Sequence, residues 1–201
     1  AFVALNVVGF FVAGQPPARD ADAAELAKYF VDNDSGLKLG AILFGIALIL
    51  GLMWLGSLWR VIGRLEPDGP RLAVVAVVGF VMSGTIAAGA QALFVTPALR
   101  PDTLAGAGEL MWTSGYVAYS LALATTAAHM LALGALVLWR RFLPTWTGWL
   151  ALVSAAACAV ATVGAGSESS AFTAAQGIGF LTWLVWVLVA SIFLYRRASA
   201  A

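Results

Sequence analysis

The sequence has very little charge. Of its 201 residues only 10% are Asp, Glu, Lys or Arg, whereas 62% are hydrophobic. A soluble domain has about a quarter of its residues charged, so the composition predicts an integral membrane protein. The formal net charge is +1 and no stretch is densely basic, which argues against a nucleic-acid partner. Little polar sequence is left over, so we expect one membrane domain, residues 1–201, with no second soluble domain.

Residues for site chemistry are also scarce. There is one cysteine, Cys158, and one histidine, His129. One cysteine forms no internal disulfide, and a zinc or copper site needs three or four ligands, so no metal site is predicted. The sequence has no phosphate-binding glycine-rich loop and no Gly-x-Ser-x-Gly turn around a nucleophile. We therefore assign no catalytic residue and disfavour an enzyme.

Long apolar runs dominate what is present. A helix rises about 1.5 Å per residue and must cross about 30 Å of hydrocarbon, which takes roughly 20 residues. The first run is too short to cross and is interpreted as the outer part of a span; the alternative, a cleavable signal peptide, lacks its basic start. The fold class is an all-α bundle of about six transmembrane helices, approximately residues 1–14 (partial), 37–59, 72–95, 112–139, 146–165 and 172–195.

The most charged segment lies between the first two runs. Asp22, followed three residues later by Glu25, resembles a capping box and predicts the start of a short amphipathic helix. The apolar face of this helix would lie on the bilayer surface or cap the bundle. That face would contain Ala23, Leu26, Ala27 and Phe30, with Asp20, Asp32 and Asp34 in water.

Proline and small residues mark the ends and contacts of the spans. Turns are predicted at 66–70 and 142–144, and the segment 96–101, which contains two prolines, is predicted to break the helix of the third span. Small or polar residues four apart let helix backbones approach closely. Such stripes comprise Gly79, Ser83, Ala87 and Gln91 in the third span and Ser154, Cys158 and Thr162 in the fifth.

Orientation follows from the arginines and lysines in alternate loops. The side with more of them is expected to be cytoplasmic. In a bacterial plasma membrane, both termini would then lie on the cytoplasmic side. That side has Arg60, Arg64, Arg71, Arg140, Arg141, Arg196 and Arg197, against Arg19, Lys28, Lys38 and Arg100 on the other.

The run 112–141 is the most polar of the apolar runs. Its helical spacing places Tyr119, Thr126 and His129 on one face. An ionisable group inside a span raises a functional hypothesis, although a histidine that only hydrogen-bonds a neighbouring helix is the simpler interpretation. A proton relay and a haem ligand are the other possibilities, the haem needing a methionine as second ligand. The candidate ligand-binding residues are His129, Thr126, Tyr119, Tyr116, Gln91 and Trp183.

Two segments carry a resemblance. The first, LWRRFLPTWTGWLAL, has Pro144, Trp146, Gly148 and Trp149 after a basic turn, and the second, LTWLVWVLVASIFLYRR, is a tryptophan-rich last span ending in paired arginines. In these segments the chain resembles a group of actinobacterial multi-span membrane proteins that share a domain of unknown function. The resemblance implies a six-span bundle and assigns no catalytic residue.

Three functions are therefore weighed. The first is an auxiliary or scaffolding subunit of a larger membrane complex, because small-residue stripes are present and catalytic motifs are absent. The alternative is a small-molecule or lipid-binding protein or transporter with a cavity around His129. The second alternative is a haem or quinone redox subunit. Membrane lipids, other subunits or further copies of the chain are the expected partners, and no cofactor beyond a bound lipid is predicted.

Overall fold

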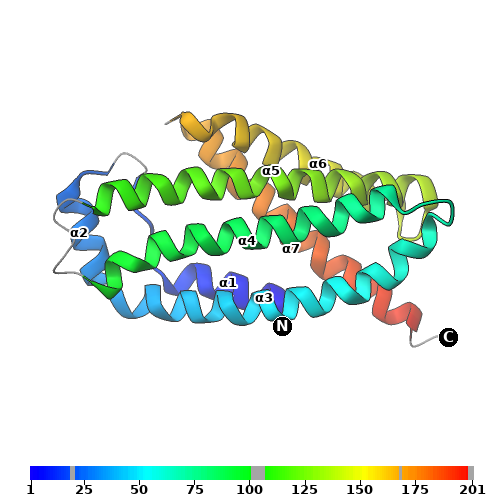
Figure 1. The fold of residues 1–201 in the computed structure, drawn as a ribbon, viewed down its shortest axis with the longest axis horizontal. Coiled ribbons are helices and arrows are strands. Elements are labelled where there is room, and N and C mark those ends of the chain that lie inside the picture. Colours follow the sequence, from blue (N-terminus) through cyan, green and yellow to red (C-terminus); the bar gives the residue numbers. More distant parts are fainter. Residues whose placement is uncertain (19–20, 101–106, 168, 199–201) are drawn as a thin grey trace. The chain divides into compact units, whose positions relative to one another are not determined.

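The computed structural model describes residues 1–18, 21–100, 107–167 and 169–198, and within these ranges it contains helices and no strand (Figure 1). Two short helices come first, α1 (Phe2–Val12) and α2 (Ala23–Asp32). The longer elements are α3 (Asp34–Ile62) with the 3-10 turn η1 (Gly63–Leu65), α4 (Arg71–Leu99), α5 (Gly108–Arg140), α6 (Thr145–Val163) with the 3-10 turn η3 (Gly164–Gly166), and α7 (Ser170–Ala198).

In the described part of the chain, five helices are long and apolar enough to cross a membrane: α3, α4, α5, α6 and α7. The predicted all-α membrane bundle is confirmed. The predicted spans fall on these helices, and the partial first span falls on α1, which at 11 residues is too short to cross a bilayer.

The chain divides into two compact units, each described here by itself. Unit 1 comprises Ala1–Leu52 and Gly84–Tyr119, and unit 2 comprises Met53–Ser83 and Ser120–Ala201. The helices α3, α4 and α5 contribute residues to both. The prediction of one membrane domain remains a prediction.

In unit 1, glycines bring α1 against the beginning of α3. A Cβ on Gly40 would lie 3.0 Å from the carbonyl oxygen of Gly9, and a Cβ on Gly36 would overlap the carbonyl oxygen of Val12. Gly36 and Gly40 are four residues apart, the spacing at which small residues allow two helix backbones to approach. The sequence GLKLG therefore fixes where α1 lies on α3.

The helix α2 packs against the start of α5 in unit 1. Asp22 Oδ1 accepts a 2.8 Å hydrogen bond from the backbone N–H of Glu25, which confirms the predicted helix start. The Tyr29 and Phe30 rings lie 5.7 and 5.8 Å from the Trp112 ring. This helix thus packs onto unit 1, as one of the two predicted placements requires, and its position relative to a bilayer surface stays a prediction.

Two hydrogen bonds hold the connection between α1 and α2 to this aromatic cluster. The Tyr29 hydroxyl donates to the carbonyl of Ala13 at 3.0 Å, and Trp112 Nε1 donates to the carbonyl of Ala18 at 3.1 Å. The face that α2 buries is Leu26, Tyr29 and Phe30, whereas Ala23 and Ala27 are exposed. The predicted apolar face is corrected accordingly: the large aromatic ring has more surface to bury than a methyl group. Asp20 lies outside the described residues.

The predicted break of the third span within 96–101 is confirmed: α4 continues through Pro97 and ends at Leu99. Proline lacks the N–H that would bond the carbonyl four residues back. Because Pro97 lies in the last turn of α4, few helical hydrogen bonds follow it and the helix tolerates the loss. The helix ends two residues later, and the N–H of Arg100 donates to the Pro97 carbonyl at 3.2 Å.

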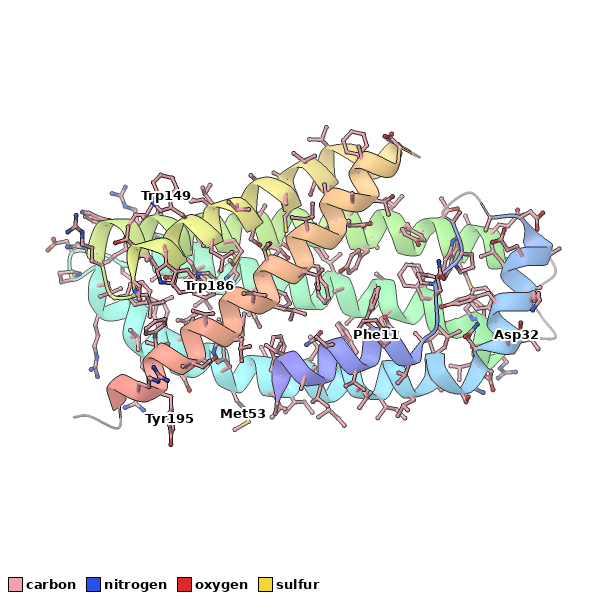
Figure 2. All side chains as sticks on the ribbon, turned by 180° about the vertical axis from the view of Figure 1, so that it is seen from behind. Phe11, Asp32, Met53, Trp149, Trp186 and Tyr195 are labelled. Carbon is pink, nitrogen blue, oxygen red and sulfur yellow. The ribbon has the colours of Figure 1, made fainter. Side chains whose placement is uncertain are left out.

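In unit 2, α6 and α7 form an antiparallel pair joined by polar contacts (Figure 1). Ser154 Oγ donates to the Gly179 carbonyl at 3.0 Å, and Trp186 Nε1 donates to the Thr147 carbonyl at 2.9 Å. Thr162 Oγ1 donates to the carbonyl of Ser120 in α5 at 3.2 Å. The stripe predicted in the fifth span therefore contacts helices on two sides. Figure 2 shows Trp186 lying among the helices.

Candidate functional site

The candidate site lies in unit 2, where the α4 and α5 backbones approach each other closely at Gly79. A Cβ on Gly79 would lie 2.8 Å from the Thr125 carbonyl oxygen and 2.9 Å from the backbone nitrogen of His129. Real side chains do not sit that close to another backbone, so only glycine fits here. The predicted small-residue stripe thus has its physical basis at Gly79, which brings the α4 backbone beside His129.

The His129 side chain is almost completely buried, with 1% of its surface exposed. Its Nδ1 lies 2.6 Å from the carbonyl oxygen of Ala76 in α4. A carbonyl oxygen only accepts hydrogen bonds, so Nδ1 carries a proton and donates it. In the neutral ring Nε2 then carries a lone pair and no proton.

The lone pair of His129 Nε2 is buried and has no hydrogen-bond partner among the residues that the structure describes. Buried polar groups in folded proteins are nearly always satisfied, so each exception needs an explanation. Leaving a buried acceptor unsatisfied costs about 1–3 kcal/mol. This nitrogen is therefore a buried acceptor whose partner is not among the described residues.

Three residues before His129, a pair of hydroxyls links the same two helices. Ser83 Oγ and Thr126 Oγ1 are 2.6 Å apart, and Thr126 Oγ1 also donates to the Ala122 carbonyl at 3.0 Å. Thr126 has a single hydroxyl proton, so Ser83 is the donor within the pair when Thr126 bonds Ala122. Both hydroxyls are thus satisfied, which sets them apart from Nε2.

Aromatic rings surround Phe80, which packs against His129. The Phe80 ring centroid lies 5.4 Å from that of His129, 5.8 Å from that of Trp54 and 6.2 Å from that of Trp183. Trp54 also links α3 to α7, because its Nε1 donates to Ser191 Oγ at 3.0 Å. The imidazole therefore lies against an aromatic cluster through Phe80.

The six residues predicted for a ligand site divide between the two units. Gln91, Tyr116 and Tyr119 belong to unit 1, where Tyr116 packs on Trp112 and Phe94 with ring centroids 5.3 and 5.5 Å apart. Thr126, His129 and Trp183 belong to unit 2, and His129 and Trp183 both contact Phe80. A site shared by all six residues remains a prediction.

Sequence reasoning missed Ala76 and Phe80. Ala76 acts through its backbone carbonyl, a group that every residue has, so its residue type gives no sign of this role. Phe80 is one of 11 phenylalanines in an apolar chain. The small-residue stripe did contain a signal. Gly79 and Ser83 lie three residues after Ala76 and Phe80, so the stripe predicted that this face of α4 contacts another helix.

The described residues contain no group of three or more His, Cys, Asp or Glu side chains that could hold a metal ion together. Cys158 is buried against Gly179 between α6 and α7. Met130 is fully buried but directly follows His129, so the two side chains leave α5 in different directions and do not face each other across one iron.

Comparison with known proteins identifies a family and adds no chemistry. Residues 1–191 match the family described as Domain of unknown function (DUF4386), and the chain belongs to that family. No curated protein and no solved structure matches the chain. The resemblance to a family with a domain of unknown function is thereby confirmed, whereas an actinobacterial source remains a prediction.

Proposed function

We propose that this protein binds a lipophilic small molecule within its membrane-spanning helices, and that a hydrogen-bond donor on the molecule faces Nε2 of His129. The observation that carries the proposal is the buried lone pair on this nitrogen, which no described residue satisfies. In a purely structural histidine, the second ring nitrogen would also bond a group on a neighbouring helix. The hydroxyls of Ser83 and Thr126 do bond each other across two helices.

The chemistry of the surroundings defines the ligand. The bond from Nδ1 to Ala76 holds the ring in one tautomer, so the ligand must offer an O–H or N–H and not an acceptor. The rings of Phe80 and Trp183 favour an apolar or aromatic body. A neutral hydroxyl-bearing lipophile meets both requirements.

One variant at His129 separates the roles of its two nitrogens. In His129→Asn, the side-chain amide nitrogen takes the position of Nδ1 and keeps a donor for the Ala76 carbonyl, while the acceptor at the position of Nε2 is lost. Ser154→Ala serves as the matched control, because it removes a different buried hydrogen bond, that to Gly179 on the α6–α7 pair.

The experiment is gentle purification of each protein from native membranes, followed by solvent extraction and mass spectrometry of the extract. We expect wild type and Ser154→Ala to carry the same small molecule and His129→Asn to retain about tenfold less, the effect of one buried hydrogen bond. Equal retention in His129→Asn, or no bound molecule in the wild type, would contradict the proposal.

The same preparation tests the other two hypotheses. A companion protein in fixed ratio to the chain, without a bound molecule, favours the auxiliary-subunit hypothesis, which the sequence placed first. A haem absorption spectrum or an extracted quinone favours the redox-subunit hypothesis.

A further inference from the structure

One end of unit 2 carries a concentration of exposed arginines. Arg60 lies in the last turn of α3, Arg64 in η1 and Arg71 at the start of α4, while Arg140 ends α5 and Arg141 follows it. All five side chains are exposed. Figure 1 shows these helix ends at the same end of unit 2. These five arginines are called the basic end below.

Little negative charge balances the basic end. The two ion pairs in the described part of the chain, Lys28–Asp32 and Lys38–Asp34, both belong to unit 1. The nearest acids in sequence are Glu66, which is buried and accepts from the Ala73 N–H, and Asp68 in the following turn. The five guanidinium groups of the basic end therefore have only two carboxylates near them in sequence, and the carboxylate of Glu66 is already hydrogen-bonded to the Ala73 N–H.

Exposed tryptophans lie next to these arginines. Trp59 precedes Arg60, Trp139 precedes Arg140, and Trp146 and Trp149 lie in the first turns of α6; all four are exposed. Trp149 and, at the end of α7, Tyr195 point outward in Figure 2. Tryptophan and tyrosine concentrate at the level of lipid headgroups, so their positions place the basic end at that level.

The turn after α5 holds two of these arginines in defined positions. Arg141 adopts a positive φ of 51°, and its N–H donates to the Val137 carbonyl at 2.8 Å, which ends the helix. Phe142 and Leu143 are buried and anchor the turn. The guanidinium carbon of Arg140 lies 3.7 Å from the ring centroid of Trp139, a cation–π contact.

The basic end uses arginine alone, since both lysines of the sequence, Lys28 and Lys38, belong to unit 1. A guanidinium group presents planar, paired donors that match two oxygens of a phosphate, which a lysine ammonium does not. We infer that the basic end is a binding surface for the phosphodiester headgroups of anionic phospholipids. This surface is independent of the ligand proposed at His129.

The test measures lipid bound to the full-length purified protein by native mass spectrometry, with phosphatidylglycerol and phosphatidylcholine added at equal concentration. Arg140→Gln/Arg141→Gln removes two charges from the basic end. The matched control Lys28→Gln/Lys38→Gln removes the same number of charges elsewhere. A basic residue near an anionic lipid surface contributes about 1 kcal/mol, which corresponds to roughly a fivefold change in binding.

We expect the wild type and the lysine variant to prefer phosphatidylglycerol, and the arginine variant to lose at least about fivefold of that preference. If the arginine variant does not fold, Arg60→Gln/Arg64→Gln tests the same surface from α3. An absence of preference in the wild type, or an equal loss in the lysine variant, would overturn the inference.

Discussion

Glu66 Oε2 accepts a 2.8 Å hydrogen bond from the backbone N–H of Ala73. This carboxylate lies in the turn before α4 and satisfies one of the N–H groups that the first turn of a helix leaves without an intrahelical partner. The negative charge also lies at the positive end of the helix dipole. The sequence predicted the turn at 66–70 but gave Glu66 no role.

Glu66→Ala is expected to destabilise the protein by about 1 kcal/mol, the usual effect of losing a side chain that caps a helix start. Unfolding by sodium dodecyl sulfate in mixed micelles measures the change. Asp68→Ala is the control, because this exposed acid lies in the same turn. Equal stability of Glu66→Ala and Asp68→Ala would show that the bond to Ala73 contributes nothing.

Gly79→Ala is expected to cost about 1–3 kcal/mol, because the added Cβ would force α4 away from the backbone of Thr125 and His129. The displacement would also lower ligand retention at His129. Gly89→Ala on the same helix is the control, since a Cβ there has no heavy atom within 4 Å. An unfolding midpoint for Gly79→Ala as high as that of Gly89→Ala would contradict the close approach.

Tyr29 predicts an alkaline dependence of stability. Burial in unit 1, with a smaller contribution from Tyr116, raises the pKa of Tyr29 from 10.0 to about 12. Below pH 10 the phenol is neutral in the folded and the unfolded chain, and its contribution is fully present. Between pH 10 and about 12 the unfolded chain ionises first, so this contribution is lost as the pH rises.

The measurement is the free energy of unfolding of wild type and Tyr29→Phe from pH 8 to pH 12. The variant lacks the hydrogen bond to Ala13 and is expected to be about 1 kcal/mol less stable at pH 8. The difference between the two proteins should shrink above pH 10. A difference that stays constant across this range would show that Tyr29 does not titrate with folding.

The helices were predictable because long apolar runs have few alternatives in a bilayer, where each backbone polar group must be satisfied within its own segment. Local hydrogen bonding was also readable, since Asp22 caps α2 through a residue three positions away. The end of α4 was also predictable, since the helix stops at Leu99 within the proline-containing segment 96–101.

The candidate site was only partly predictable. His129 was identifiable as the one histidine of the chain, inside a span. Its partners were not, because Ala76 acts through a backbone carbonyl that every residue type possesses and Phe80 through an apolar ring. Helix periodicity grouped Tyr119 with His129, although the two residues belong to different compact units.

The central claim is that His129 presents an unprotonated Nε2 to a ligand. Because the sequence contains one histidine, labelling with ¹⁵N-histidine gives the imidazole signals of this residue alone. The measurement is the ¹⁵N spectrum of the purified protein before and after the bound molecule is removed by detergent washing. We expect a proton on Nδ1 and none on Nε2 in both samples, and an Nε2 resonance that shifts when the molecule is lost. A proton on Nε2, or an Nε2 resonance that does not respond, would contradict the account.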